Sequence, residues 1–270
     1  MLKSFRITNG GTSGIGKLTS ANNFNSSRRP STQDSEDDVE FDEAEADYDD
    51  DALVVDIEVI LPESNQGSDF ATLIWDSSIV LSWYLINVLF CSNNKKNIPL
   101  MTTTLELGAG TALPSLVACS LGADTIITDR LGSDSNGIFE NVRNIIRHNQ
   151  NNGSLINKLS PRFIELSYGM FSSQAFELPS VDYLFASDLF YNNTRDYDDI
   201  FSTFAFFANK NKNINILFCY QVRSVEKTIS YLMSKWNFVG EEIEKDFLPM
   251  DVELKSEVIL FRIRPKSHSS

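Results

Sequence analysis

Histidine and cysteine are scarce in this 270-residue chain, and their scarcity narrows the chemistry it can perform. The two histidines, His148 and His268, are too few to predict a histidine-based metal site or a Ser-His-Asp hydrolase. The three cysteines, Cys91, Cys119 and Cys219, each fall within an apolar run and lack the spacing of metal ligands. We therefore expect no metal, and reduced core thiols in a cytoplasmic or nuclear protein.

Long apolar runs are also missing. The longest apolar helix candidate, Ile79 to Cys91, contains Ser82 and Asn87 and is too short to cross a bilayer. No secretory signal peptide is expected, because Asn, Ser and Gly interrupt the apolar residues near the N-terminus. The sequence thus predicts no membrane partner.

The charge of the chain, −14 overall, is spread unevenly. Residues 34–51 carry twelve acids and no base, whereas residues 1–33 carry five bases and no acid. Few groups in such an acidic run can bury themselves, so residues 1–51 are expected to form a disordered leader. The negative field disfavours nucleic acid as a partner and favours a basic one, such as a histone tail.

A glycine-rich segment within this leader, residues 11–17, has P-loop spacing up to its lysine. Leu18 nevertheless stands at the Ser/Thr position, and Ser/Asn-rich sequence follows in place of a helix and second strand. We expect no nucleotide site there.

The segment from Thr102 to Arg130 is the most informative part of the chain. It predicts a buried strand, a Gly108-Ala109-Gly110 turn, a helix with Pro114 near its start, and a second strand ending at Asp129. An acid at the end of that second strand can bind both hydroxyls of a ribose. The spacing therefore predicts a nucleoside-binding βαβ unit.

Two cofactor classes use such a unit. A dinucleotide site has a third glycine in its motif, where this chain has Leu113. It also binds phosphate near the turn, where Glu106 would repel it. An acid beside the turn suits a cationic ligand without phosphates. Acid-Leu-Gly-x-Gly resembles instead motif I of the class I methyltransferases, which bind S-adenosylmethionine.

Strands and helices alternate along the rest of the chain, which predicts an α/β fold with a parallel, doubly wound sheet. The last two strands are expected to form a closing antiparallel pair. Expected strands are 53–61, 102–107, 124–129, 162–167, 181–187, 214–220, 238–243 and 257–264; expected helices are 76–91, 136–149, 195–208 and 222–236.

A second signature follows the fourth parallel strand. Ser187 and Asp188 end that strand, and Tyr191 stands three residues after the acid. Methyltransferases that act on nucleic acid or glutamine typically carry Asn/Asp-Pro-Pro-Tyr here, and the absence of both prolines counts against those substrates.

Together these motifs are similar to the family 16 class I protein methyltransferases over roughly residues 70–264. The segments that carry the resemblance are 74–81, 106–111, 166–169, 186–191 and 220–224. It implies a seven-stranded Rossmann-like class I methyltransferase sheet with helices on both faces, spanning residues 52–264 and followed by a tail, 265–270. Most members of the family methylate lysine, and the member that this chain most resembles is assigned to histone arginine methylation.

The resemblance also implies roles for individual residues. Glu106, Gly108 and Gly110 would shape the methionine and ribose pocket, Asp129 would hold the ribose, and Tyr168, in place of the usual Trp, would cover the adenine. Trp75 would close the cofactor site or belong to the core, and Ser187 is counted with the cofactor-binding residues. Asp188 and Tyr191 would face the incoming nitrogen, and Arg223 could pair an acid or the cofactor carboxylate.

The function expected from the sequence is S-adenosylmethionine-dependent methylation of a protein, with histone arginine as its target. The expected partners are histone H3 and chaperones, in cytoplasm and nucleus. Three alternatives stay open: a lysine methyltransferase acting on a non-histone protein, an acidic histone-binding module without catalysis, and a small-molecule methyltransferase. Chemistry alone favours lysine, because only one carboxylate, Asp188, is clearly placed to accept a proton from arginine.

Overall fold

The computed structural model describes most of the chain from residue 73 onward and parts of the N-terminal region. The acidic run and residues 11–17 lie outside the described residues. The described ranges are 2–9, 18–19, 53–60, 73–92, 95–96, 101–130, 135–153, 160–191, 193–223, 229–250 and 252–266.

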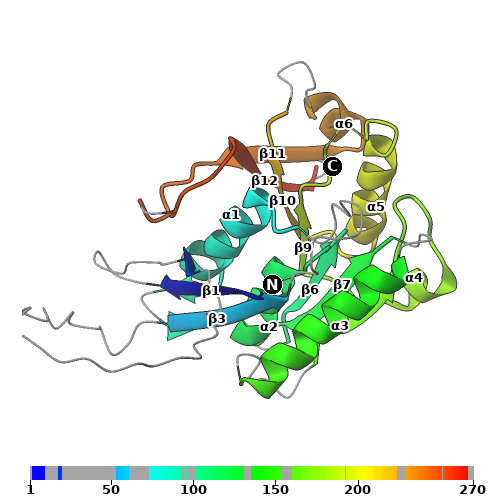
Figure 1. The fold of residues 1–270 in the computed structure, drawn as a ribbon. Coiled ribbons are helices and arrows are strands. Elements are labelled where there is room, and N and C mark those ends of the chain that lie inside the picture. Colours follow the sequence, from blue (N-terminus) through cyan, green and yellow to red (C-terminus); the bar gives the residue numbers. More distant parts are fainter. Residues whose placement is uncertain are drawn as a thin grey trace, which may run out of the picture.

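A seven-stranded sheet in the order β11-β12-β10-β9-β6-β7-β8 forms the centre of the fold (Figure 1). Strands β8, β7, β6, β9 and β10 are parallel, and β12 runs antiparallel to both β10 and β11. The Rossmann-like sheet and its closing antiparallel pair are thus confirmed. The strands are β6 Thr103–Leu107, β7 Asp124–Asp129, β8 Arg162–Glu165, β9 Tyr183–Ser187, β10 Asn215–Gln221, β11 Phe238–Ile243 and β12 Val258–Pro265.

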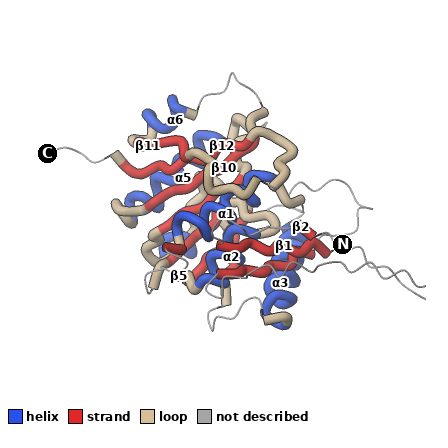
Figure 2. The backbone as a smooth tube through the Cα atoms, turned by 90° about the vertical axis from the view of Figure 1, so that its left-hand side faces the viewer, coloured by secondary structure: helices blue, strands red, loops and turns tan. Residues whose placement is uncertain are grey.

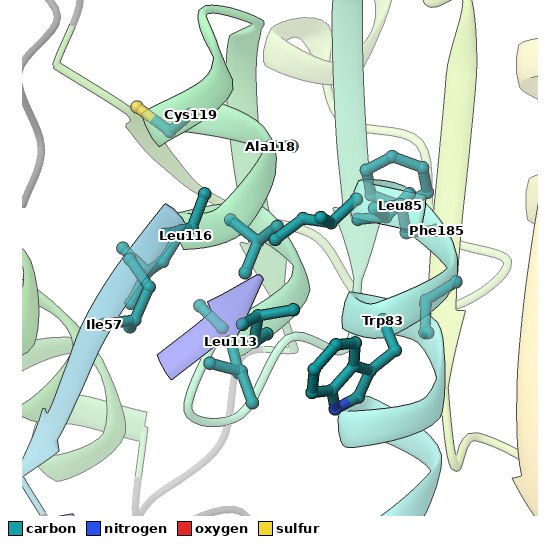
Figure 3. Close-up of a cluster of buried hydrophobic side chains, with 14 of the residues drawn as sticks. Ile57, Trp83, Leu85, Leu113, Leu116, Ala118, Cys119 and Phe185 are labelled. Atoms are coloured by element: carbon teal, nitrogen blue, oxygen red, sulfur yellow. The ribbon is translucent and has the colours of Figure 1, made fainter. Parts of the chain in front are cut away.

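Helices cover both faces of this sheet because its strands are apolar on both sides. In β9, Leu184 and Ala186 join the core beneath α4, α5 and α6, while Phe185 joins the core beneath α1, α2 and α3. Figure 3 shows the core beneath α1, α2 and α3, with Phe185 near Leu85 and Trp83. The helices are α1 Asp76–Tyr84, a π-helical turn η2 Leu85–Leu89, α2 Leu113–Leu121, α3 Ser135–Asn151, α4 Ser173–Glu177, α5 Tyr197–Lys210 and α6 Ser230–Lys235.

The order of the sheet places the site. Strand order reverses between β6 and β9, and in open α/β sheets ligands bind beyond the carboxyl ends of the strands at such a point. The residues that follow β6, β7, β9 and β10 are therefore the candidates.

The N-terminal region contains a second sheet, β2-β1-β3, formed by Leu18–Thr19, Leu2–Asn9 and Leu53–Ile60. Phe5 of β1 is paired with Ile57 of β3, and both side chains are buried in the core shared with α1, α2 and α3. Figures 1 and 2 place this sheet beside α2, away from β11. The structure therefore differs from the disordered leader expected over residues 1–51: its first described segment is a strand, stabilised by a partner some fifty residues later in the chain.

The helices expected over 136–149 and 195–208 are found within two residues of their predicted bounds, whereas two others differ in form or in start. The helix expected over 76–91 changes to π-helical geometry at Leu85, and the helix expected over 222–236 begins, in the described residues, only at Ser230. Val222 and Arg223 instead continue from β10 as a loop. This displacement brings Arg223 to the end of the sheet where the site lies.

Two smaller observations complete the fold. Cys91–Ser92 and Lys95–Lys96 form a short antiparallel pair, β4 and β5, and Cys119 and Cys219 are buried, as expected of core thiols. None of the helices in the described ranges has both the length and the apolar character needed to cross a membrane.

Candidate functional site

The turn after β6 requires glycine at its first position. Gly108 has φ +63°, and a Cβ there would meet Leu189 Cδ2 at 2.5 Å and the hydroxyl of Tyr168. Gly110 also has positive φ, +52°, so the chain bends sharply across both glycines. The turn predicted from the sequence is present, and side chains from beyond β8 and β9 pack directly against it.

Asp129, at the end of β7, holds this turn. Its Oδ2 accepts a hydrogen bond from the Gly110 amide at 2.8 Å, and its Oδ1 accepts one from the Arg130 amide at 2.7 Å. The side chain is buried, 6% exposed. The acid that spacing predicted for a ribose therefore lies at the glycine turn, fixed by backbone donors.

Glu106 is the last but one residue of β6 and is fully buried. Its Oε2 accepts a hydrogen bond from the Ser115 amide at 3.0 Å, whereas its Oε1 has no hydrogen-bond partner among the described residues. The pKa of the carboxyl is raised to about 8, mainly by burial; the hydrogen bonds from Ser115 oppose this increase and the charge of Asp129 adds to it. Glu106 is thus a buried acid with an unused acceptor, which a cationic group would stabilise in its charged form.

Tyr168 approaches the same turn from the loop after β8. Burial is the main cause that raises the pKa of its hydroxyl, and the neighbouring charge of Asp129 adds to it. The next residue, Gly169, donates its amide to Thr203 Oγ1 of α5 at 2.9 Å. Tyr168 is therefore anchored with its hydroxyl over Gly108, at the edge of the predicted pocket.

Asp188 lies at the end of β9 in an unusual conformation. Its φ is +57°, a value that non-glycine residues seldom adopt, and its amide donates to the Cys219 carbonyl at 2.7 Å. The carboxylate accepts two hydrogen bonds from Arg223, at 2.9 Å from Nη1 and 2.5 Å from Nη2. It accepts a third from the backbone amide of Gln221 at 3.2 Å. Of the partners open to Arg223 in the sequence, the structure selects Asp188.

Trp75 lies on the other side of the same guanidinium. The Arg223 Cζ is 5.4 Å from the centroid of the Trp75 ring, within the range of a cation–π contact. The Trp75 carbonyl also receives the Ser78 amide and hydroxyl at the start of α1. Trp75 therefore contacts Arg223, the partner of Asp188, and sequence reasoning did not predict this contact.

Tyr191 and Ser187 complete the predicted set. Tyr191 is exposed, and its backbone is held by Asn193 Oδ1 at 3.0 Å and by the Tyr197 hydroxyl at 2.6 Å. Ser187 is half-buried at the end of β9.

The predicted residues thus form two adjacent groups. We call Glu106, Gly108, Gly110, Asp129 and Tyr168 the glycine-turn group, and Trp75, Asp188 and Arg223 the Asp188 group. Leu189 joins them, because it follows Asp188 in the chain and packs against Gly108. Tyr191 lies close enough to Tyr168 to raise the pKa of the Tyr168 hydroxyl.

Sequence reasoning missed two supporting residues. Ser115 donates its backbone amide to Glu106 from α2, and Leu189 packs against the turn. In the sequence both have the character of ordinary helix and core residues. Gln221, which donates its backbone amide to Asp188, lies at the end of a parallel strand, where the sequence predicts ligand-binding residues.

Comparison with known proteins gives consistent matches. A lysine methyltransferase family matches residues 55–239. The chain is 40% identical over 222 residues to methyltransferase-like protein 23 of Dictyostelium discoideum, covering 79% of this chain and 85% of that protein. It is 28% identical to the human histone-arginine methyltransferase METTL23, covering 67% and 86%, and 31% identical to the cattle protein-lysine methyltransferase METTL21E, covering 47% and 40%.

Proposed function

The chain belongs to the lysine methyltransferase family, and on that premise we propose that it transfers a methyl group from S-adenosylmethionine to an arginine of a histone. Protein methylation is the activity of the family. The choice of arginine, the histone and the roles of individual residues are our inference.

The glycine-turn group fits S-adenosylmethionine. The single observation that carries this assignment is the Oε1 of the fully buried Glu106, which has no hydrogen-bond partner among the described residues. A bound cation would stabilise the charged form of this carboxyl, and the cofactor is cationic. When bound, S-adenosylmethionine supplies an electrophilic methyl group on a sulfonium. Gly108 and Gly110 would shape the turn that faces it, Asp129 would bind its ribose, and Tyr168 would cover its adenine, with Ser187 alongside.

The Asp188 group would receive the substrate nitrogen. Losing the proton at pH 7 costs roughly 4.6 kcal/mol for lysine and at least roughly 7.5 kcal/mol for arginine, from their ordinary pKa values. Arginine therefore needs a carboxylate that orients the guanidinium and accepts a proton as the reaction proceeds. Asp188 is buried, 7% exposed, and already binds a guanidinium through both oxygens, which supports this role. Tyr191 would line the approach.

Relatives support arginine over lysine. The human, frog, mouse and rat relatives named histone-arginine methyltransferase match 66–68% of this chain, whereas the lysine-specific METTL21E relatives match 47%. We propose histone H3 as the substrate, with chaperones as further partners, and the cytoplasm and nucleus as the location. The acidic residues 34–51 would attract the basic histone tail.

The test is to incubate the full-length protein with histones, cell extract and isotopically labelled S-adenosylmethionine, and to locate the label by mass spectrometry. We expect label on histone arginine, lost in the Asp188→Asn variant. Label on lysine of another protein would instead support the lysine alternative.

A second variant separates catalysis from simple histone binding. Deleting residues 34–51 removes the acidic run and leaves β1 and β3 in place. A methyltransferase should keep its turnover on a short arginine peptide after this deletion. Loss of every activity together with histone binding would favour the histone-binding module.

A further inference from the structure

Arg223 is bound as a substrate arginine would have to be bound. Its guanidinium donates to both oxygens of Asp188 in a parallel pair of hydrogen bonds, the arrangement specific to arginine among basic residues. The ring of Trp75 lies over the same guanidinium, and the side-chain oxygen of Gln221 accepts from Nη2 at 3.1 Å. One guanidinium is thus contacted by a carboxylate, an aromatic face and an amide.

This pocket can hold only one guanidinium at a time. Of the two Asp188 oxygens, Oδ1 accepts from both Gln221 and Arg223, and Oδ2 accepts from Arg223. A second guanidinium cannot form the same two-point contact while Arg223 remains. The charge of Asp188 is also paired with that of Arg223, so a second guanidinium gains less from this carboxylate while Arg223 remains.

We propose that Asp188, Trp75 and Gln221 form a guanidinium subsite that Arg223 fills in the resting protein. The substrate arginine binds by displacing Arg223, which rests on the function proposed above. Lysine carries a point charge without the planar fork, so it gains less from this subsite. Because the substrate must displace Arg223, this residue favours substrates with a guanidinium and also lowers the apparent affinity for them.

The position of Arg223 makes displacement feasible. Its side chain is 27% exposed, whereas that of Asp188 is 5% exposed, so the carboxylate is the fixed partner and the arginine lies on the solvent side. Arg223 also stands in a loop after β10, outside helix and strand.

The experiment measures binding and turnover separately. Arg223→Gln removes the cation, and Arg223→Lys keeps the charge without the fork. A matched control is Arg162→Gln, which removes another arginine–aspartate pair. Arg162 Nη2 lies 2.7 Å from Asp124 Oδ2, and these residues begin β8 and β7, at the edge of the sheet away from the site. Calorimetry without cofactor measures the binding of an arginine peptide from the histone H3 tail and of the same peptide with lysine in place of arginine.

We expect the arginine peptide to bind about tenfold more tightly to Arg223→Gln than to the wild type, if Arg223 fills the subsite about 90% of the time. Arg223→Lys should gain part of this effect, and Arg162→Gln none. The gain should vanish in the Asp188→Asn, Arg223→Gln double variant. Equal binding to wild type and Arg223→Gln would overturn the inference.

Ethylguanidinium separates an occupant from a fixed part of the site. If Arg223 is an occupant, ethylguanidinium competes with the arginine peptide on Arg223→Gln and inhibits its methylation. If it restores lost turnover instead, Arg223 is a fixed positioning residue and the inference is wrong. Tighter binding of the arginine peptide with methylation found only on lysine would refute the proposed function while the subsite stands.

Discussion

The glycine-turn group and the Asp188 group both lie at the carboxyl ends of parallel strands, but their polar side chains differ in what they still lack. Glu106 is fully buried, one of its oxygens has no hydrogen-bond partner in the described part of the chain, and its pKa is raised to about 8. Asp188 is nearly as buried, yet it accepts three hydrogen bonds, two of them from a cation of the same chain. The first group is missing a cation, and the second already has one.

This difference indicates how each group meets its ligand. A preformed site with an unsatisfied acceptor gains a hydrogen bond or charge pair on binding and has no internal contact to break. A site filled by an arginine of the same chain must lose that contact first, so only a ligand that forms the same guanidinium–carboxylate contact can bind well. The glycine-turn group can therefore bind a cation without breaking an internal contact, whereas the Asp188 group selects the ligand that competes best with Arg223.

The largest expected effect is on stability at the cofactor end. The pKa of Glu106 is about 8 in the folded protein against 4.5 for the free group, so its contribution to stability is full below pH 4.5 and is lost as pH rises to 8. At about 1.4 kcal/mol per pH unit, this removes about 5 kcal/mol from the free energy of unfolding. Urea unfolding of wild type and Glu106→Gln at several pH values should show this slope only in the wild type.

The control for this measurement is Glu140→Gln, an exposed acid of α3. Parallel pH curves for wild type and Glu106→Gln would show that Glu106 is charged in the free protein. Saturating S-adenosylmethionine should flatten the wild-type slope, because a bound cation favours the carboxylate.

The second effect is on turnover at the substrate end. Asp188→Asn should lower kcat on the protein substrate on the order of 10²- to 10⁴-fold, the range for loss of a general base. Asn tolerates the positive φ of Asp188, so the backbone should be preserved. Cofactor affinity, measured by calorimetry, should not change. Asp198→Asn, which removes an equal charge from α5, is the control, and equal losses in both variants would remove the catalytic role of Asp188.

The third effect returns to the glycine turn. Asp129→Asn keeps an acceptor for the Gly110 amide but loses the charge that strengthens its hydrogen bonds, and with it about 1.5–3 kcal/mol of cofactor binding. Titration calorimetry should therefore show S-adenosylmethionine binding about 10- to 100-fold more weakly, with kcat at saturation nearly unchanged. Asp124→Asn, at the other end of β7, should bind normally. A loss of kcat without a loss of affinity would place Asp129 at the reaction instead of the ribose.

The contrast between the two groups also explains what the sequence could predict. The Gly108 turn and Asp129 are local features of one βαβ unit, so their spacing was enough to place them together. The pairing of Asp188 with Arg223 joins residues that follow two different strands, so the sequence could say only that Arg223 pairs with an acid or with the cofactor carboxylate. The helix predicted over 222–236 also misplaced Arg223, which lies in a loop. The β1–β3 pairing was missed for a similar reason: its strands are separated by a long stretch that gave the whole region the composition of a leader.

The smallest effect concerns Trp75, which sequence reasoning placed either at the cofactor or in the core. Its ring faces the Arg223 guanidinium at 5.4 Å, a contact worth about 0.5–1 kcal/mol when partly exposed. If the substrate arginine takes the place of Arg223, Trp75→Ala weakens the occupant and its competitor alike, and the KM for an arginine peptide should hardly move. In the Arg223→Gln background only the substrate loses the contact, so the same substitution should raise KM about two- to fivefold, a factor that Trp75→Phe should largely restore. Steady-state kinetics on the four variants tests this directly, and weaker cofactor binding in Trp75→Ala would instead assign Trp75 to the glycine-turn group.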